Sequence, residues 1–130
     1  MKKSVYLAGK IDGLTFTQAM AWRRAITGKL GQFDVNCPSY SLEENHPNLM
    51  WDKDYFLLDN SDIVLVNLDY ENNSPFLGTS MEIGRAFYQR KPIIIFSSKD
   101  WVHKSLTLQY HATAIVNDID EAIDIIQQFI

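Results

Sequence analysis

Short, strongly apolar runs alternate along this chain with longer segments of helical periodicity, and this alternation constrains the fold more than any single motif does. The clearest run, residues 63–68, is nearly continuous and rich in β-branched side chains, which predicts a strand buried on both faces. Strands are likewise expected at residues 4–8, 33–37, 92–96 and 113–116. Strands that alternate with helices predict an α/β fold, in which a parallel sheet carries helices on both faces.

Start signals mark two of the helices between these runs. Thr15 and Gln18 have the spacing of a capping box, and the helix that follows is expected to stop near Gly31. Asp118 and Glu121 mark the start of the final helix in the same way. Other helices are expected at residues 49–60 and 79–90, with an irregular or short helical segment at 97–109. Open parallel sheets bind ligands beyond the carboxyl ends of their strands, so the loops that follow the strands are the segments to search.

Composition limits the classes of function that fit. A chain of 130 residues with 46% hydrophobic content is enough for one domain, residues 1–130, with a sizeable core. Its net charge of −4 and its scattered basic residues argue against a nucleic acid polymer as partner, whereas a small ligand needs no basic patch. The first apolar run ends at Gly9, which makes it too short for a signal peptide or a membrane span. A cytoplasmic protein without a membrane partner is therefore expected.

Neither a disulfide nor a metal centre is expected. Cys37 is the single cysteine, which excludes a disulfide within the chain and a zinc cluster of cysteines. A small buried side chain at a strand end is its simplest interpretation. The histidines, His46, His103 and His111, lack the spacing of metal ligands. No pattern typical of a serine or cysteine nucleophile is present.

The segment with the clearest chemical content is residues 78–86, Gly-Thr-Ser-Met-Glu-Ile-Gly-Arg-Ala, which opens a helix after the central strand. Glu82 is expected in the first turn, where the helix dipole and free N–H groups would keep its carboxylate ionised and able to attack an anomeric carbon. Thr79 and Glu82 also have the spacing of a capping box, in which the glutamate only folds back onto the cap. Both interpretations stay open at this point. Gly84 costs roughly 1 kcal/mol inside a helix, which favours close packing or close ligand approach there.

Asp54 stands out in an acidic stretch near the middle of the chain. It shares a helical stripe with Leu57, Leu58 and Ser61, so its side chain is expected to point toward the sheet. A carboxylate in that position is a candidate acid or orienting group. The acidic residues of this stretch are Asp52, Asp54, Asp59, Asp62 and Asp69. A solvated helix face, caps and turns explain most of them, and Asp62, which begins a strand, is expected to be structural.

Two further features border the expected ligand-binding edge. Gly9 and Gly13 frame the turn after the first strand, where the backbone can approach a ligand, although a plain turn is an equal interpretation. Lys10 in this turn either meets a phosphate or stays solvated. Trp51 and Trp101 lie in or beside loops at this edge, where a flat ligand could stack on them, although packing in a core or interface is the commoner role.

Together these segments resemble the nucleoside 2-deoxyribosyltransferase family. The likeness is carried by Tyr-Leu-Ala-Gly at residues 6–9, by Asp54 eight residues before Asp-Ile-Val, and by the block at 78–86 followed by Lys-Pro-Ile. It covers most of residues 4–97. The resemblance implies a flavodoxin-like, Rossmann-like three-layer sandwich with a five-stranded parallel sheet. It also implies an enzyme that moves the sugar of a 2′-deoxynucleoside from one base to another, in purine or pyrimidine salvage, without a cofactor.

The resemblance also implies roles for particular residues. Glu82 would be the nucleophile, Asp54 the carboxylate that helps to position and protonate, and Tyr6 the residue that orients Glu82. Substrate contacts are implied for Gly9, Lys10, Asp69, Phe76, Gly78 and Thr79. Members of the family assemble as homodimers or larger homo-oligomers in which a neighbouring subunit completes the site. In this chain, residues 97–111 would provide that contribution.

One departure from the family pattern leaves the substrate open. Many transferases place an aspartate two residues before the Gly-Thr pair, whereas this chain has Phe76 there, with Asp69, Asn72 or Asn73 as candidate substitutes. Related nucleotide N-glycosidases, in which water is the acceptor, place a serine there and add a set of phosphate-binding residues that this chain does not match. Three interpretations follow: a transferase, a deoxynucleoside 5′-monophosphate N-glycosidase, and a non-catalytic nucleotide-binding module.

Overall fold

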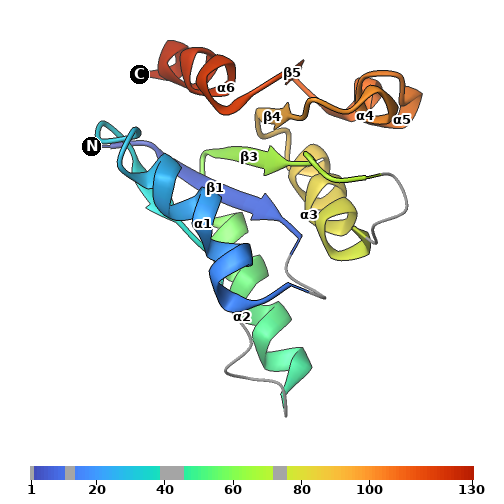
Figure 1. Cartoon of the computed structure of the whole chain (residues 1–130). Coiled ribbons are helices and arrows are strands. Elements are labelled where there is room, and N and C mark those ends of the chain that lie inside the picture. The colour runs from blue at the N-terminus through green and yellow to red at the C-terminus, as the bar shows by residue number, and fades with distance from the viewer. Residues whose placement is uncertain (1, 11–13, 39–45, 72–75) are drawn as a thin grey trace.

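The computed structural model describes residues 2–10, 14–38, 46–71 and 76–130, and a parallel sheet lies at its centre (Figure 1). The strands are β1 (Ser4–Gly9), β2 (Asp34–Asn36), β3 (Ile63–Asn67), β4 (Ile93–Phe96) and β5 (Ala114–Val116). The helices are α1 (Phe16–Thr27), α2 (Pro47–Asp59), α3 (Leu77–Tyr88), α4 (Asp100–His103), α5 (Leu106–His111) and α6 (Ile119–Ile126), with the 3-10 helix η1 (Gln127–Phe129) last. Strands and helices therefore alternate as the apolar runs predict.

The order of strands in the sheet is β2-β1-β3-β4-β5, and every neighbouring pair is parallel. This is the flavodoxin-like order of doubly wound sheets, so the expected α/β fold with five parallel strands is confirmed. The winding of the chain reverses between β1 and β3, where Gly9 pairs with Asn67 at the carboxyl ends of both strands. Ligands of such folds bind in the crevice at this reversal point.

Each face of the sheet has its own apolar core, because successive residues of a strand point to opposite faces. On one face, α1 and α6 pack against the strands through Ile26, Ala122, Ile123 and Ile126. On the other face, the strands meet α2, α3, α4 and α5 through Leu58, Ile83, Ala86, Val102 and Leu108. Tyr6 of β1 belongs to this second core, so its side chain lies on the face covered by α2 and α3.

The capping signals of two helices form as expected. Oγ1 of Thr15 accepts a hydrogen bond from the Gln18 amide at 3.1 Å, and the Gln18 side chain accepts one from the Thr15 amide at 3.0 Å. Oδ1 of Asp118 accepts from the Glu121 amide at 2.9 Å at the start of α6. These bonds satisfy amides that have no partner inside the helix.

Several helix boundaries differ from the expected ones, and both α2 and α3 begin two residues earlier than expected. α1 ends at Thr27 rather than near Gly31, because the Gly28 amide bonds to the carbonyl of Ile26 and begins a turn. Segment 97–109, expected to be irregular or a short helix, forms α4 and the first part of α5, separated by a tight turn. The late end expected for α1 has a simple reason: Leu30, beyond the turn, is also buried and keeps the helical phase, so the apolar periodicity continues past the true end of the helix.

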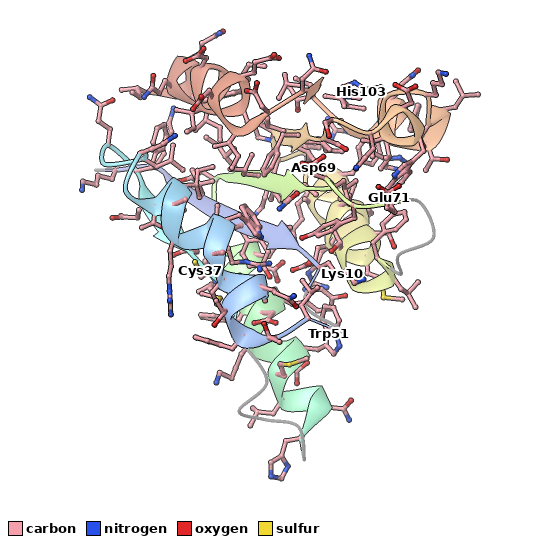
Figure 2. The ribbon with its side chains drawn as sticks, viewed as in Figure 1. Lys10, Cys37, Trp51, Asp69, Glu71 and His103 are labelled. Carbon is pink, nitrogen blue, oxygen red and sulfur yellow. The ribbon has the colours of Figure 1, made fainter. Side chains whose placement is uncertain are left out.

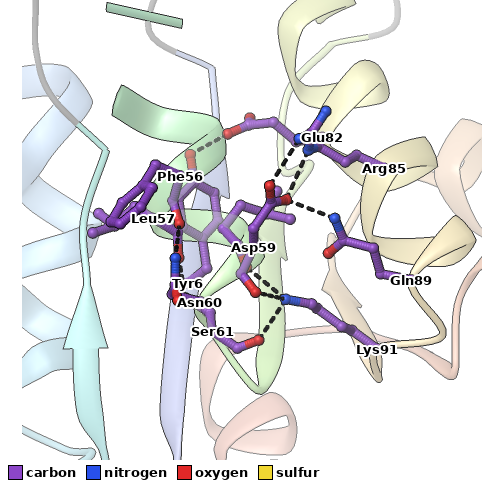
Figure 3. Close-up of polar contacts among 11 residues, drawn as sticks. Tyr6, Phe56, Leu57, Asp59, Asn60, Ser61, Glu82, Arg85, Gln89 and Lys91 are labelled. Atoms are coloured by element: carbon purple, nitrogen blue, oxygen red, sulfur yellow. Dashed lines mark hydrogen bonds and ion pairs between the residues drawn. The ribbon is translucent and has the colours of Figure 1, made fainter. Parts of the chain in front are cut away.

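A polar clamp fixes α2 against α3 (Figure 3). Nε and Nη2 of Arg85 each donate to the Asp59 carboxylate at 2.8 Å, and the Gln89 amide donates to it at 2.6 Å. Nζ of Lys91 donates to three carbonyl oxygens at the end of α2, at 2.7 to 2.8 Å. The hydrogen bond from Arg85 lowers the pKa of Asp59 to about 2. The clamp therefore sets the relative position of the two helices that carry the candidate carboxylates.

Candidate active site

Glu82 and Tyr6 meet on the face of the sheet that α2 and α3 cover. Glu82 lies in the second turn of α3 and is 5% exposed, whereas Tyr6 of β1 is fully buried. The Tyr6 hydroxyl donates a hydrogen bond to Oε2 of Glu82 (Figure 3). Since the two residues are 76 positions apart, the bond depends on the whole fold rather than on local sequence.

Asp54 reaches the same buried cluster from α2. It is 4% exposed and lies on the inward stripe of the helix with Leu58 and Ser61, so the expected direction of its side chain is confirmed. Burial is the main cause that raises the pKa of both Tyr6 and Glu82, and the negative charge of Asp54 raises both further. Two carboxyl groups and a phenol therefore share one poorly hydrated site.

Burial, not the start of the helix, dominates the ionisation of Glu82. Removal from water raises the pKa of Glu82 to about 8. The hydrogen bond from Tyr6 and the positive charge of Arg23 lower this pKa, and the charge of Asp54 raises it. The expectation that the helix N-terminus keeps Glu82 ionised is wrong. The helix dipole acts mainly on the first turn, and Glu82 lies beyond that turn.

The capping interpretation of Glu82 is also wrong. α3 begins at Leu77 rather than at Thr79, and its N-cap residue is Phe76, which makes no side-chain capping bond. Thr79 is buried inside the helix, and the Glu82 carboxylate bonds to Tyr6 instead of folding back onto a cap. The Thr-x-x-Glu spacing has a different origin here, since both residues face the sheet.

Arg23 is a buried member of the site that the sequence interpretation missed. Its side chain is fully buried on α1, where Nη1 donates to the carbonyl of Ala19 and Nη2 donates to that of Gly9 at 3.1 Å. The guanidinium interacts electrostatically with Glu82 from the far side of β1. A signal was present, because Arg23 occupies the inward stripe of an amphipathic helix, four residues after Ala19 and three before Ile26.

The turn after β1 is held by aromatic side chains. A Cβ on Gly9 would lie 2.8 Å from the ring of Trp22, so the glycine is required for packing against α1. Lys10 is half-buried, and its amide donates a hydrogen bond to the hydroxyl of Tyr70 in the loop after β3. The predicted turn continues through residues 11–13, which lie outside the described residues.

Gly78 of α3 allows a tryptophan from α2 to approach. A Cβ at this position would lie 2.8 Å from the ring of Trp51, whose ring in turn packs on Tyr55 at 5.2 Å between centroids. Trp51 and Gly78 precede the two candidate carboxylates by one helical turn on their respective helices. Gly84 behaves differently: nothing lies within 4 Å of its added Cβ, so close packing does not explain this glycine, and close approach of a ligand stays a prediction.

The loops after β3 and β4 are tied to each other. Oδ1 of Asp69 accepts from the amide and the hydroxyl of Ser98, at 2.8 and 2.7 Å, and Glu71 in the same loop pairs with Lys99. Figure 2 shows Asp69 and Glu71 in the segment that follows β3. Asp69 is therefore engaged with the β4 loop. Asn72 and Asn73, the other candidate substitutes, lie outside the described residues.

Phe76 packs into an aromatic contact at this edge. Its ring centroid lies 5.3 Å from that of Trp101, whose indole N–H donates to the carbonyl of Tyr70 at 2.7 Å. The position where many transferases carry an aspartate is thus filled by an apolar group that holds α4 near α3.

Among the described residues, no three acidic, histidine or cysteine side chains gather closely enough to hold a metal ion. No helix in the described part of the chain is long and apolar enough to cross a membrane. Cys37 lies one residue beyond β2 and is half-buried against the core, so its expected position is close to the observed one.

A groove of about 850 Å³ lies at the other end of α3 and contains none of the predicted site residues. It is lined by Gly84, Phe87, Tyr88, Arg90 and Lys91 on one side and by Pro92, Tyr110, His111, Ala112 and Thr113 on the other. The missing side chain of Gly84 leaves this groove open.

Fold and site together define a doubly wound α/β protein with two buried carboxyl groups below the carboxyl edge of its sheet. A family model described as nucleoside 2-deoxyribosyltransferase YtoQ matches residues 48–130. This match spans more than half of the chain and includes both carboxyl groups. The chain therefore belongs to the nucleoside 2-deoxyribosyltransferase family. A search of curated proteins gives no match.

Solved structures share the fold at low sequence identity. A 2-deoxyribosyltransferase from Leishmania mexicana superimposes with a TM-score of 0.77 at 17% identity, over 97% of both chains. One from Bacillus psychrosaccharolyticus gives 0.73 at 16%, over 93% of this chain and 90% of that one. A conserved protein from Enterococcus faecalis V583 gives 0.73 at 14%, over all of both chains. At these identities the likeness establishes the fold.

Proposed function

We propose that the protein is a nucleoside 2-deoxyribosyltransferase that cleaves the N-glycosidic bond of a 2′-deoxynucleoside through a covalent deoxyribosyl-Glu82 intermediate. The observation that carries this proposal is the buried carboxyl pair, Glu82 and Asp54, with Tyr6 bonded to the first. A retaining glycosyl transfer needs two carboxyl groups in different roles, one as nucleophile and one as acid and base. Membership of the family supports the class of substrate.

In the first half-reaction, a carboxylate oxygen of Glu82 attacks C1′ of the deoxyribose. The bond between C1′ and the base nitrogen breaks, and its electron pair leaves with the base. Asp54 in its protonated form gives its proton to the departing base, which makes the base a better leaving group. Tyr6 holds Oε2 of Glu82, so Oε1 is the oxygen that we expect to attack.

In the second half-reaction, another base attacks C1′ from the side that the first base left. The bond between Glu82 and C1′ breaks, and its electron pair returns to the carboxylate. Asp54 accepts the proton that the incoming nitrogen loses. Two inversions give net retention at C1′, and electrons and protons balance over the cycle without a cofactor.

The nucleoside is proposed to bind at the carboxyl ends of β1 and β3, where doubly wound folds bind ligands. The loop after β1 would contribute contacts, as would the loop after β3 and the first turn of α3. The proposed contact residues are Gly9, Lys10, Asp69, Phe76, Gly78 and Thr79.

Chromatography of a base-exchange mixture tests this function. The mixture contains 2′-deoxyadenosine, 2′-deoxyinosine or thymidine as donor, with free cytosine and adenine as acceptors. We expect a new deoxynucleoside from the wild-type protein and none from Glu82→Ala, whose circular dichroism should stay native. A folded Glu82→Ala protein that still exchanges bases would contradict the mechanism. Ligand binding without any product would favour a non-catalytic module.

A second candidate function is hydrolysis of a deoxynucleoside 5′-monophosphate. The specific observation in its favour is Phe76, which packs on Trp101 where many transferases carry an aspartate. Faster turnover of the monophosphate than of the nucleoside, with free base released and no exchange, would favour this function. Equal turnover or exchange would count against it.

We also propose that the chain self-associates through an apolar face of α3 and α5. Leu77, Met81 and Tyr88 form one stripe of α3, and Leu106 and Tyr110 form a stripe of α5, with exposed fractions of 53% to 89%. The two helices touch through Phe87 and Tyr110, whose ring centroids are 5.5 Å apart. Contiguous apolar surface of this kind is typical of subunit interfaces. α5 belongs to segment 97–111, from which a neighbouring subunit is expected to complete the site.

Light scattering after size-exclusion chromatography tests this assembly. Tyr88→Asp combined with Leu106→Asp is expected to give a smaller particle than the wild type. Phe56→Asp is the matched control, since Phe56 is 70% exposed on α2, outside the proposed face. A monomeric wild-type protein at micromolar concentration would contradict the proposal.

A further inference from the structure

The groove at the other end of α3 lies apart from the candidate active site. α3 and the turn after it form one side of the groove, and the end of α5 with the segment that leads into β5 forms the other. Gly84 lines it and is exposed, whereas Glu82, two residues earlier, is buried. The groove volume of about 850 Å³ is within the range of small-molecule sites in proteins.

Two residues at this groove are less favourable for stability than their alternatives. Gly84 lies inside α3, where alanine forms a helix better, and packing does not explain the glycine because an added Cβ would meet nothing within 4 Å. Arg90 has a φ of 60°, in the left-handed region that favours glycine. Because both departures from stability occur at one groove, they indicate a requirement of function.

The backbone at the end of α3 requires one left-handed residue. The Arg90 amide donates to the carbonyl of Phe87 at 3.0 Å, and the Lys91 amide donates to that of Ala86 at 3.1 Å. These bonds form a Schellman motif, which ends a helix with one left-handed residue that is usually glycine. An arginine at this position lowers stability and places a cation beside the groove.

Arg90 is the cation that this groove offers to a ligand. Arg90 is exposed, and no hydrogen bond or ion pair within the described part of the chain engages its guanidinium. Nζ of Lys91, which also lines the groove, already donates to carbonyls at the end of α2. None of the described lining residues is acidic. The charge of Arg90 therefore fits an anion.

Aromatic rings form one wall of the groove. The ring centroids of Phe87, Tyr110 and His111 lie 4.5 to 5.5 Å from one another. Planar groups stack on such rings. Gly84 precedes Phe87 by one helical turn, so its missing side chain leaves space next to this ring. The wall and this space together fit a flat ligand.

We propose that this groove binds a small anion that carries a planar aromatic ring, of the size of a nucleoside monophosphate. The ring lies on the wall of Phe87, Tyr110 and His111, and the anionic group accepts hydrogen bonds from Arg90. The planar N–H fork of a guanidinium matches the oxygens of a phosphate or a carboxylate. Because the groove contains none of the predicted site residues, this binding does not depend on the proposed function.

A second copy of the chain is the competing occupant, since Tyr88 and Tyr110 also belong to the face proposed for self-association. That face does not supply a charge opposite to that of Arg90. Glu82 is the single acidic residue in the sequences of α3 and α5, and it is buried. Charge complementarity therefore favours an anionic ligand.

Titration of the wild-type protein with adenosine 5′-monophosphate, followed by proton–nitrogen NMR, tests the inference. We expect saturable shifts of the backbone amide signals of Gly84, Ala112 and Thr113. The signals of Gly78 and Thr79 report separately on the candidate active site. Adenosine, which lacks the charge, and ribose 5-phosphate, which lacks the ring, should each bind the groove about tenfold more weakly or less.

Variants at the two unfavourable positions separate a functional role from a structural one. Arg90→Gly removes the cation and relieves the left-handed residue, so it should resist urea better than the wild type and bind adenosine 5′-monophosphate about tenfold more weakly. Gly84→Leu fills the groove and should abolish the shifts. Arg24→Gln is the matched control, because it removes an exposed arginine of α1 and should leave binding unchanged.

Each result decides for or against the groove as a ligand site. Shifts at Gly78 and Thr79 alone would overturn the inference, as would equal binding of adenosine or unchanged binding in Arg90→Gly or Gly84→Leu. If the wild type binds no probe in the groove and Gly84→Leu gives a smaller particle in light scattering, a second copy is the occupant. Binding in the groove by a protein that turns over no nucleoside would support the inference and refute the proposed function.

Discussion

In the proposed mechanism Glu82 must lose its proton before it can attack, and its burial opposes that loss. Because burial raises its pKa to about 8, the ionised fraction increases with pH through the neutral range. We expect kcat/KM for a 2′-deoxynucleoside donor to increase between about pH 6 and about pH 9 and then to level off. Initial rates of base exchange at constant ionic strength measure this. A profile that is flat or falls over that interval would contradict an ionised Glu82 as nucleophile.

Tyr6→Phe removes the hydroxyl that donates to Glu82 and keeps the ring in its core. Hydrogen bonds to charged groups contribute about 1.5 to 3 kcal/mol, so kcat should fall roughly 10- to 100-fold. The rising limb of the pH profile should also move upward, since the Tyr6 bond lowers the pKa of Glu82. Tyr88→Phe, which removes the same hydroxyl from an exposed side chain of α3, is the matched control. Full activity in Tyr6→Phe would show that Tyr6 does not orient the nucleophile.

The sequence points to some residues of this site and not to others. Asp54 could be assigned an inward direction because helical periodicity is local, and its burial confirms that direction. The protonation of Glu82 could not be deduced, since it depends on burial beneath α2 and on partners from β1 and α1. Arg23 was missed because an arginine on an inward stripe is usually assumed to extend its charge to solvent.

Substitution by alanine is expected to change the free energy of unfolding in opposite directions at two glycines of α3. Gly78→Ala places a Cβ 2.8 Å from Trp51, so overpacking should lower the free energy of unfolding by about 1 to 3 kcal/mol, partly offset by helix propensity. In Gly84→Ala the added Cβ meets nothing within 4 Å, so the better helix propensity of alanine should raise the free energy of unfolding by up to about 1 kcal/mol. Urea denaturation measures both.

Trp51→Phe provides the control for Gly78. In the Gly78→Ala/Trp51→Phe protein, the smaller ring should relieve part of the collision, so the two changes should cost less together than their sum. If the two alanine variants are equally stable, or if the double variant shows no coupling, Gly78 is not required for the approach of Trp51.

Element boundaries show where local signals suffice. The starts of α1 and α6 were predictable because Thr15 and Asp118 cap them with side chains three residues from their partners. The start of α3 was not, because Phe76 makes no capping bond and is held by packing on Trp101, a contact between distant parts of the chain. Local pattern therefore misplaced this helix start by two residues and supported a capping box that does not form.

The order of strands follows from the alternation of elements and from the rules of right-handed crossover. Five apolar runs were enough to predict five parallel strands: the central strands β1, β3 and β4 are buried on both faces, whereas the edge strands β2 and β5 are only partly buried. The assembly of charges across β1 could not be predicted, since it arises where α1 on one face and α2 and α3 on the other converge on one strand.

The burial of Glu82 also has a consequence for the stability of the whole protein. Its pKa rises from 4.5 in the unfolded chain to about 8 in the folded one, so the folded state binds more protons between these values. The free energy of unfolding should therefore decrease as pH rises from about 4.5 to about 8, by up to a few kcal/mol. In Glu82→Gln this part of the decrease should be absent. Urea denaturation at both ends of the interval measures the difference, and identical pH dependence in the two proteins would contradict a buried, protonated Glu82.

Trapping the intermediate tests the proposed mechanism most directly. Wild-type protein is mixed with excess 2′-deoxynucleoside, quenched with acid during turnover and digested for mass spectrometry. We predict a mass increase of one deoxyribosyl group on the peptide that contains Glu82, lost when an acceptor base is added before the quench. Asp54→Asn, which lacks the proposed acid and base, should form the adduct more slowly. Base exchange with no adduct on Glu82, or an adduct on another residue, would contradict Glu82 as the attacking carboxylate.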